Sequence, residues 1–304
     1  MNRRIIEIAD RGQYLSTHRG FMVVNKGKEE RGRVPLADIE VLMLTSQGNS
    51  LSTNLIHALL EQNAMIVFCG PNFQPAGMVW PTAPHHLHTQ RLQLQIGATV
   101  PLKKRLWQNL VQAKIGCQAE VLNFFGLPDA DLISLTKQVG SGDPQNCEAQ
   151  AARRYWPTLM GKEFRRDPRI EGINSLLNYG YSVLRSATAR ALAGSGLHPS
   201  LGIHHHNQSN SFCLADDLME PFRPLVDWTV RQLADEESIE MVPEIKKRLA
   251  GILKMDLETS RGRSPVSNCL LKLAQSLVSS FTERKPGLDL PDSVIPLTTT
   301  IEEL

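Results

Sequence analysis

The chain has 304 residues, a formal net charge of +2 at pH 7, 41% hydrophobic residues and 21% charged residues. These proportions are typical of a folded globular protein with one large or two ordinary domains. No apolar run reaches the ~18–20 residues of a membrane span, and acids soon follow the arginines of "MNRRIIEIAD", so neither a span nor a signal peptide is expected. The five cysteines are scattered and form no C-x-x-C pair, which predicts a cytoplasmic protein without a disulfide framework.

Residues 1–80 have the pattern of a small β-rich, sandwich-like domain. Short β-branched runs such as "RIIEIA", "FMVVNKG" and "RVPLADIEVLML" are separated by Gly, Asn and Lys-Glu turns. The stretch "SLSTNLIHALLEQN" begins with Ser and Thr and has apolar residues at helical spacing, which predicts one short helix. The runs "AMIVFCG" and "QPAGMVWP" then resemble closing strands.

The pattern changes after the segment 81–90, "PTAPHHLHTQ", which is rich in Pro and His and predicts a linker. From residue 91 to 286, apolar residues recur at three- and four-residue spacing, which indicates a larger all-α domain. The expected fold class is therefore α+β, with the β-rich domain first. The remaining segment, 287–304, has two prolines and little periodicity, so we expect a tail that is flexible or docked without regular structure.

The least ordinary stretch is "LGIHHHNQSNSFCLADDLMEPFRPLVD", which has three consecutive histidines and an acidic cluster. If the cluster is helical, Asp217 and Glu220 share a face and repel each other unless a cation lies between them. Pro221 and Pro224 interrupt or kink the helix here, so a pocket could open. The alternatives to a cation site are an acidic first turn that complements the helix dipole, or salt bridges to Arg223 and its neighbours.

The histidines do not form one ligand set by spacing alone. In an extended segment the side chains alternate, so His204 and His206 point one way and His205 the other. On spacing alone, His204 and His206 are the better zinc pair.

A third candidate, Glu148, lies in "SGDPQNCEAQAARRYW", where Asp143 is the expected N-cap and Pro144 the first helical residue. Taken alone, Glu148 just past the first turn indicates complementation of the helix dipole. Positive charge is concentrated nearby, because residues 151–190 contain eight basic residues and three acids. Such a cluster, like a second one near residues 246–263, suits either a phosphate backbone or a solvated helix face.

Three motifs carry a resemblance: "CEAQAARRYW", "INSLLNYGYSVLRS" and "GLHPSLGIHHHNQSNSFCLADDLMEPFRPLVD". Together they resemble the CRISPR-associated integrase family, the large subunit of the complex that inserts new spacers into a CRISPR array. The segment "HNQSNSFCLADDLMEPFRP" resembles sequences of the branch found with single-effector, RNA-guided DNA-cutting systems. The resemblance covers essentially the whole chain. It implies an integrase and endonuclease of antiviral defence, in which a DNA 3′-hydroxyl attacks a phosphodiester at the repeat ends.

The resemblance also implies site residues, position by position. The family's metal-binding glutamate matches Glu148, and its histidine, which ends a Gly-x-x-His step, matches His205. Its acidic pair matches Asp217 and Glu220, of which Glu220 is the more secure ligand. Glu148, His205 and Glu220 are thus the implied catalytic residues, with Mg²⁺ or Mn²⁺ as cofactor. Asn174 matches a recurring polar position of the family.

The implied partners are double-stranded DNA, both incoming fragment and repeat, and a small second CRISPR adaptation protein. The β-rich domain is expected to form a homodimer, and two dimers bridged by the small protein would form a heterohexamer. The candidates for contacts to DNA phosphates are Arg153, Arg154, Lys162, Arg165, Arg166, Arg169, Lys246, Lys247 and Arg248. Two rival hypotheses are a zinc-dependent hydrolase that uses His204 and His206, and a non-catalytic DNA-binding scaffold.

Overall fold

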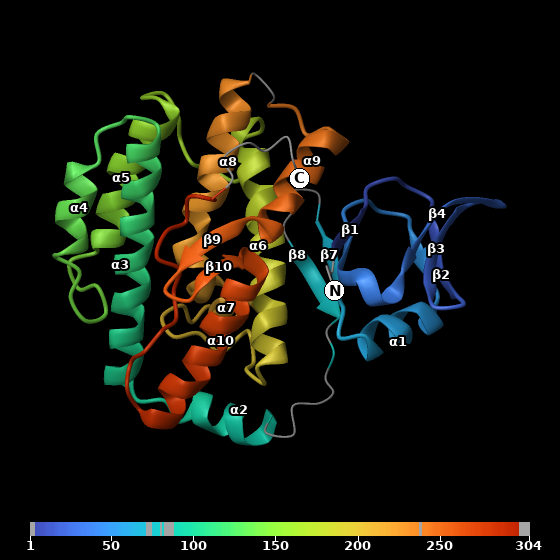
Figure 1. Cartoon of the computed structure of the whole chain (residues 1–304), viewed down its shortest axis with the longest axis horizontal. Coiled ribbons are helices and arrows are strands. Elements are labelled where there is room, and N and C mark those ends of the chain that lie inside the picture. Colours follow the sequence, from blue (N-terminus) through green and yellow to red (C-terminus); the bar gives the residue numbers. More distant parts are fainter. Residues whose placement is uncertain (1–3, 71–74, 80, 82–87, 237–238, 298–304) are drawn as a thin grey trace. The chain divides into compact units, whose positions relative to one another are not determined.

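The structure is a computed structural model that describes residues 4–70, 75–79, 81, 88–236 and 239–297 (Figure 1). The chain divides into two compact units, Met1–Pro84 and His85–Leu304. The boundary falls inside the predicted linker, 81–90, of which residues 82–87 lie outside the described residues. The last residues of that range already belong to helix α2, His88–Ile96.

The first unit is β-rich, as the sequence predicts. Its described residues form two four-stranded sheets with the orders β1-β5-β7-β8 and β4-β3-β2-β6. In the first sheet β1, β5 and β7 are parallel and β8 is antiparallel to β7. The strands are β1 Arg4–Ile8, β2 Tyr14–His18, β3 Phe21–Lys26, β4 Glu29–Pro35, β5 Ile39–Leu44, β6 Ser50–Leu51, β7 Met65–Cys69 and β8 Pro75–Val79.

Both sheets contribute to one core. Leu15 and Met22 from one sheet and Leu42 and Ile66 from the other are fully buried in the same cluster. The predicted helix is confirmed as α1, Thr53–Glu61, which adds two buried leucines to this core.

The run "RVPLADIEVLML" does not form one strand. Strand β4 ends at Pro35, a short 3₁₀ turn spans Leu36–Asp38, and β5 then enters the other sheet. Proline has no N–H for a strand ladder, so it suits the end of a strand. One continuous apolar run in the sequence therefore contains two strands that belong to different sheets.

The second unit is mostly helical, and its centre is α6, Ile173–Gly194, which is buried over most of its length. Helix α6 packs against α7, α8, α9 and α10, while α3 packs against α4, α5 and α8. No helix of the described chain is long and apolar enough to cross a membrane. The other helices are α3 Val100–Phe124, α4 Ala130–Thr136, α5 Cys147–Met160, α7 Cys213–Met219, η2 Glu220–Phe222, α8 Arg223–Asp235, α9 Pro243–Gly251, η3 Ile252–Lys254 and α10 Val266–Glu283.

This unit departs from the all-α prediction at an antiparallel hairpin, β9 Asp256–Thr259 and β10 Gly262–Pro265. The hairpin turn is closed by the Thr259 hydroxyl, which donates to the Gly262 carbonyl at 2.6 Å, and Gly262 has a φ of +95°. These strands are only four residues long, too short for a clear alternation of apolar residues.

The described part of the tail, 287–297, is docked without regular structure, one of the two states expected for it. The Val294 N–H and the Ser293 hydroxyl both donate to Glu120 Oε2 on α3, at 3.2 and 3.0 Å. The Asp292 N–H donates to the Glu258 carbonyl of the hairpin, and the Val294 side chain is fully buried. Residues 298–304 of the predicted tail lie outside the described residues.

Two helical glycines give a matched test of the packing between α6 and α8. A Cβ added at Gly180 of α6 would lie 2.5 Å from Val226 Cγ1, whereas one at Gly116 of α3 would meet nothing within 4 Å. Gly180→Ala is expected to destabilise the protein by about 1–3 kcal/mol through overpacking. Gly116→Ala is expected to stabilise it by up to about 1 kcal/mol through helix propensity. Denaturant unfolding measures both, and a Gly180→Ala variant as stable as Gly116→Ala would contradict this packing.

Candidate functional site

Two glutamates that are distant in sequence meet at one lysine. Glu148 lies in the first turn of α5 and Glu220 opens the turn η2, and α3 contacts both elements. Lys114 of α3 places its Nζ 2.6 Å from Glu148 Oε1 and 2.6 Å from Glu220 Oε2. The Lys114 and Glu220 side chains are only 12% and 5% exposed, and that of Glu148 is 24% exposed. The two carboxylates thus share a largely buried ammonium group.

The start of α5 fixes the position of Glu148, but not as predicted. The helix begins at Cys147, and Asp143 and Asn146 both have positive φ, so the prediction of a helix from Pro144 is wrong. Asp143 nevertheless caps the helix from outside, because its carboxylate accepts the N–H groups of Cys147 and Glu148 at 2.8 and 3.0 Å. This cap holds the backbone of Glu148 directly.

Glu220 lies where the chain changes direction. Helix α7 ends at Met219, Glu220 and Pro221 form the 3₁₀ turn, and α8 begins at Arg223. Arg223 Nε lies 3.1 Å from Glu220 Oε1. Among the described residues, neither Glu220 Oε2 nor Arg223 Nε meets hydrogen-bond geometry with a partner, so these short contacts are described as ion pairs. The acid cluster therefore lies at a break between helices, as the two prolines predict.

The buried charges of this cluster keep their ionised forms. Burial alone would raise the Glu220 pKa, but Arg223 and Lys114 offset it, and the pKa is lowered overall. Burial alone would lower the Lys114 pKa, but Glu220 and Glu148 offset it, and the pKa is raised overall. Each charge is stable at neutral pH because its opposite lies beside it.

Asp217 organises the histidine loop, which we define as residues 202–206. Its fully buried carboxylate accepts the backbone N–H groups of Ile203, His204 and His205 at 2.6, 2.9 and 3.3 Å. Its Oδ1 also lies 2.5 Å from His205 Nδ1. Because a carboxylate only accepts hydrogen bonds, the proton is on Nδ1, and Nε2 is the nitrogen available for an ion.

The pKa of His205 is raised, first by the hydrogen bond to Asp217 and then by further charges that include Glu220 and Glu148. These two carboxylates are therefore near enough to His205 to act on its charge. Asp217, by contrast, is occupied by the histidine loop. Of the predicted ligands, Glu148 and Glu220 converge on one cation, and Asp217 is hydrogen-bonded to the His205 imidazole.

Gly202 permits this wrapping of the loop around Asp217. A Cβ at this position would lie 2.2 Å from the His205 carbonyl oxygen and 3.0 Å from Asp217 Oδ2. The backbone cannot move away without breaking the hydrogen bonds to Asp217, so a side chain does not fit. The first residue of the Gly-x-x-His step is thus glycine for a steric reason.

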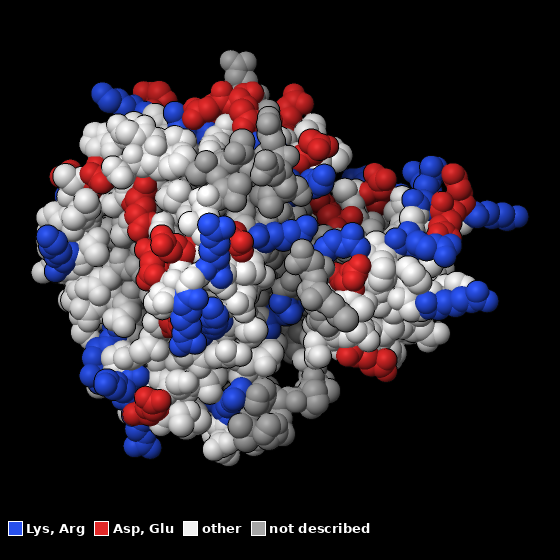
Figure 2. All heavy atoms as spheres, viewed as in Figure 1, with Lys and Arg blue, Asp and Glu red and all other residues white. Residues whose placement is uncertain are grey.

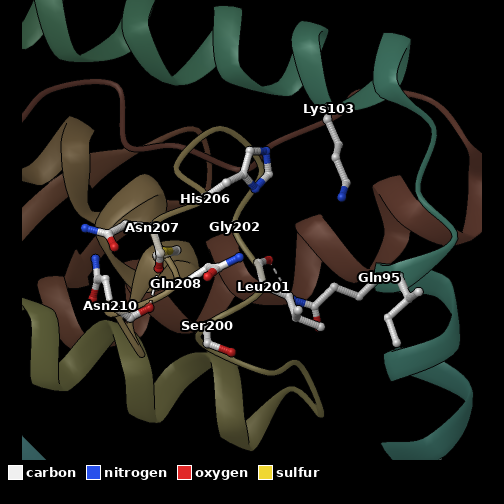
Figure 3. A pocket seen from close by; sticks show the side chains of 11 residues that line it. Gln95, Lys103, Ser200, Leu201, Gly202, His206, Asn207, Gln208 and Asn210 are labelled. Atoms are coloured by element: carbon white, nitrogen blue, oxygen red, sulfur yellow. Dashed lines mark hydrogen bonds between the residues drawn. The ribbon is translucent and has the colours of Figure 1, made fainter.

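The flanking histidines have other surroundings. The His204 ring stacks on Trp107 with centroids 4.2 Å apart, and the His205 ring meets the same Trp107 edge-on at 5.5 Å. The prediction that His204 and His205 point to opposite sides is therefore wrong, because the loop curls around Asp217 and is not extended. His206 lines a separate cavity of about 380 Å³ together with Gln95 and Lys103 (Figure 3).

The donor set suits a hard divalent ion. Within the described residues, no three His, Cys, Asp or Glu side chains are close enough to enclose a metal ion. Lys114 occupies the space between the two glutamates instead. Glu220 Oε2 is nonetheless a buried carboxylate oxygen whose 2.6 Å contact with Lys114 Nζ lacks hydrogen-bond geometry. Two carboxylates and the Nε2 of His205 are ligands that Mg²⁺ or Mn²⁺ accepts, so the residues fit such an ion.

The predicted phosphate-binding residues do not form one group. The side chains of Arg153, Arg154, Lys162, Arg165 and Arg169 are exposed. Arg169 is paired with Asp167, and Arg248 is paired with Glu236 through two hydrogen bonds. Figure 2 shows Lys and Arg interspersed with Asp and Glu on the face displayed.

Arg166 lies apart from the exposed arginines. Its guanidinium donates to Asn174 Oδ1 and Asn178 Oδ1 at 2.9 and 2.8 Å and lies over the Tyr181 ring. Asn174 also donates to the Arg165 carbonyl at 3.1 Å. Asn174 and Arg166 thus fasten the turn that carries Arg165. Lys246 similarly lies 6.0 Å above the ring of Tyr179, whereas Lys247 is exposed.

Sequence reasoning missed Lys114. A signal was present in α3, which has a buried stripe through Trp107, Leu110, Gln118 and Val121. Lys114 occupies the position of that stripe between Leu110 and Gln118. A lysine on the apolar face of a long helix requires a buried partner, since an isolated buried ammonium is costly.

Comparison with known proteins places the chain. The family described as "CRISPR associated protein Cas1" matches residues 6–256. The chain is 36% identical to the CRISPR-associated endonuclease Cas1 of Neisseria meningitidis serogroup C over 291 residues, 94% of this chain and 95% of that protein. It is 28% identical over 293 residues to the CRISPR-associated endonuclease Cas1 2 of Pyrobaculum aerophilum, 91% of this chain and 98% of that protein.

Solved structures share the fold. A casposase bound to an integration product superposes with a TM-score of 0.80 at 20% identity, over 100% of this chain and 96% of that one. A Cas1 protein from Thermotoga maritima gives a TM-score of 0.74 at 16% identity, over 95% and 99%. A chain of a Cas6-RT-Cas1–Cas2 complex gives 0.76 at 18% identity, over 95% of this chain and 36% of that one. With a family match across most of its length and a relative above 30% identity, the chain belongs to the Cas1 family of CRISPR-associated proteins.

Proposed function

We propose that the protein is a metal-dependent DNA integrase and endonuclease that inserts spacer DNA into a CRISPR array. The observation that carries the proposal is the convergence of Glu148 and Glu220 on one buried cation. The same two carboxylates also raise the pKa of His205. Two kinds of similarity support it. The relative from Neisseria is named an endonuclease, and the casposase of similar fold is bound to an integration product.

Glu148, Glu220 and the Nε2 of His205 are the groups that would hold Mg²⁺ or Mn²⁺. When bound, such an ion stabilises negative charge at the phosphodiester and makes a hydroxyl a better nucleophile. Asp217 keeps the His205 proton on Nδ1, away from the side that would face the ion. Arg223 offsets the negative charge of Glu220. The nucleophile is the 3′-hydroxyl of the incoming DNA, so no protein nucleophile is required.

The exposed basic residues of the 153–169 region are proposed to hold DNA phosphates. Arg153 and Arg154 follow Glu148 on the same helix, and Arg165 lies in the turn fastened by Arg166 and Asn174. Contacts of this type position a strand without reading its sequence. Lys247 is a further exposed candidate, while the pairing of Arg248 with Glu236 makes it a weaker one.

We further propose that the protein works with the small adaptation protein Cas2, as two homodimers bridged in a heterohexamer. The support is the fold shared with a chain of a Cas6-RT-Cas1–Cas2 complex. Integration at both ends of a repeat requires two chemical sites at a fixed separation, which such an assembly supplies. The zinc hydrolase hypothesis is disfavoured, because His204 is stacked on Trp107 while His206 lines a separate cavity.

Single substitutions test the ligand assignment. Glu148→Gln, Glu220→Gln and His205→Ala are each expected to reduce strand transfer at least about 100-fold, because each removes a ligand for the ion. The measurement is joining of a labelled duplex with 3′-hydroxyl ends to repeat DNA, with Mg²⁺ or Mn²⁺ and the small partner protein. His206→Ala is the control and should keep most activity. The assignment is wrong if His206→Ala loses activity while His205→Ala retains it.

Asp217→Asn tests the support behind His205. Asparagine keeps the shape but loses the carboxylate that faces Nδ1, so we expect a 10–100-fold loss of Mn²⁺ affinity and of strand transfer. The control is Asp216→Asn, because the Asp216 carboxylate accepts hydrogen bonds from Arg185 and Asn210, whereas that of Asp217 accepts those of Ile203, His204 and His205. Circular dichroism checks folding. Equal loss of activity in both variants would mean that Asp217 acts only through stability.

Salt dependence tests the proposed phosphate contacts. Replacing Arg153, Lys162 and Arg165 with Ala should weaken DNA binding. It should also flatten the slope of log affinity against log salt by about 0.9 per lost phosphate contact. Arg248→Ala, which removes an arginine already paired with Glu236, should leave the slope nearly unchanged. An unchanged slope in the triple variant would remove these residues from the interface.

A further inference from the structure

We propose that Lys114 is an internal cation that holds Glu148 and Glu220 together without a metal ion and competes with the divalent ion for the same carboxylates. The inference rests on the proposed function, because it takes these glutamates as ligands. It adds that Lys114 lowers the affinity of the site for its divalent ion.

Both glutamates contact the same ammonium group. Lys114 Nζ is 2.6 Å from one oxygen of each carboxylate. Glu220 Oε2, one of these two oxygens, is buried, and its contact with the ammonium is an ion pair without hydrogen-bond geometry. Two carboxylates that meet in a largely buried place without a cation between them repel each other strongly. Lys114 therefore neutralises two carboxylates that are largely shielded from water.

The positive and negative side-chain charges of this cluster balance. Lys114 and Arg223 carry two positive charges, and Glu148 and Glu220 carry two negative charges. A divalent ion bound to the same carboxylates would face the Lys114 ammonium within a few ångströms, and two like charges at that separation are unfavourable. The ammonium has to withdraw from at least one carboxylate when the ion enters. Metal binding is then weaker by the free energy of the contacts that Lys114 gives up.

If Lys114 competes with the ion, its removal changes metal affinity in the opposite direction from that expected if Lys114 only supports the structure. If Lys114 only orders the glutamates, its removal disorders them and weakens metal binding. If Lys114 competes, its removal strengthens metal binding and destabilises only the metal-free protein. The comparison therefore needs metal affinity and stability from the same variant.

The test is Lys114→Met, which keeps an unbranched side chain one heavy atom shorter and removes the charge. Mn²⁺ affinity is measured by electron paramagnetic resonance, and thermal unfolding is measured in EDTA and in saturating Mn²⁺. We expect Mn²⁺ to bind at least about tenfold more tightly than to the wild type. We also expect a lower Tm in EDTA that Mn²⁺ restores. Lys104→Met is the matched control, an exposed lysine of the same helix, and should change neither quantity.

A second pair of variants covers the case in which Lys114→Met fails to fold. Glu148→Gln removes the repulsion between the carboxylates, so Glu148→Gln with Lys114→Met should be stable in EDTA. It should bind Mn²⁺ more tightly than Glu148→Gln alone. Unchanged or weaker Mn²⁺ binding after loss of Lys114 would overturn the inference and leave the proposed function standing. No saturable Mn²⁺ binding in either the wild type or Lys114→Met would overturn both.

Discussion

The site depends on a group of buried charges that are stable only together. Glu148, Lys114, Glu220 and Arg223 come from three elements, α5, α3 and the junction of η2 and α8, and each offsets the desolvation cost of a neighbour. Removing one member leaves an uncompensated buried charge. The packing of α3 against α5 and against η2 is therefore linked to the electrostatics of the cluster.

The fold supplies the rigid frame for this cluster. The α6–α8 contact at Gly180 brings backbones close, and α8 begins directly after Glu220. The histidine loop has no regular structure, yet Asp217 gives its backbone three acceptor contacts and holds the imidazole as well. A loop fixed in this way can present a side chain with the precision of a helix. The proposed ligand His205 thus owes its placement to a buried acid on α7 and to the absence of a side chain at Gly202.

Much of this organisation could be predicted from the sequence. The order of a β-rich unit and a mostly helical unit follows from the change in apolar periodicity, and it is confirmed. The family follows from the three motifs, and it is confirmed as well. Spacing alone did not select His205. It favoured the outer histidines, because it assumed an extended segment and could not foresee that Asp217 would curl the loop.

Other features could not be predicted from sequence patterns, for physical reasons. The start of α5 is set by Asp143, whose carboxylate reaches over residues with positive φ, so a local N-cap rule places the helix too early. The hairpin after α9 is too short to show an alternating pattern. Lys114 has the helical spacing of a core residue, and its meaning depends on two partners 34 and 106 positions away along the chain.

The proposed function requires that His205, with Glu148 and Glu220, holds a divalent ion. Pulsed electron paramagnetic resonance of bound Mn²⁺ tests it most directly, because it detects a coordinated imidazole nitrogen. We expect a nitrogen coupling in the wild type that persists in His204→Ala and His206→Ala and disappears in His205→Ala. A coupling that survives in His205→Ala and disappears in His204→Ala or His206→Ala would contradict it.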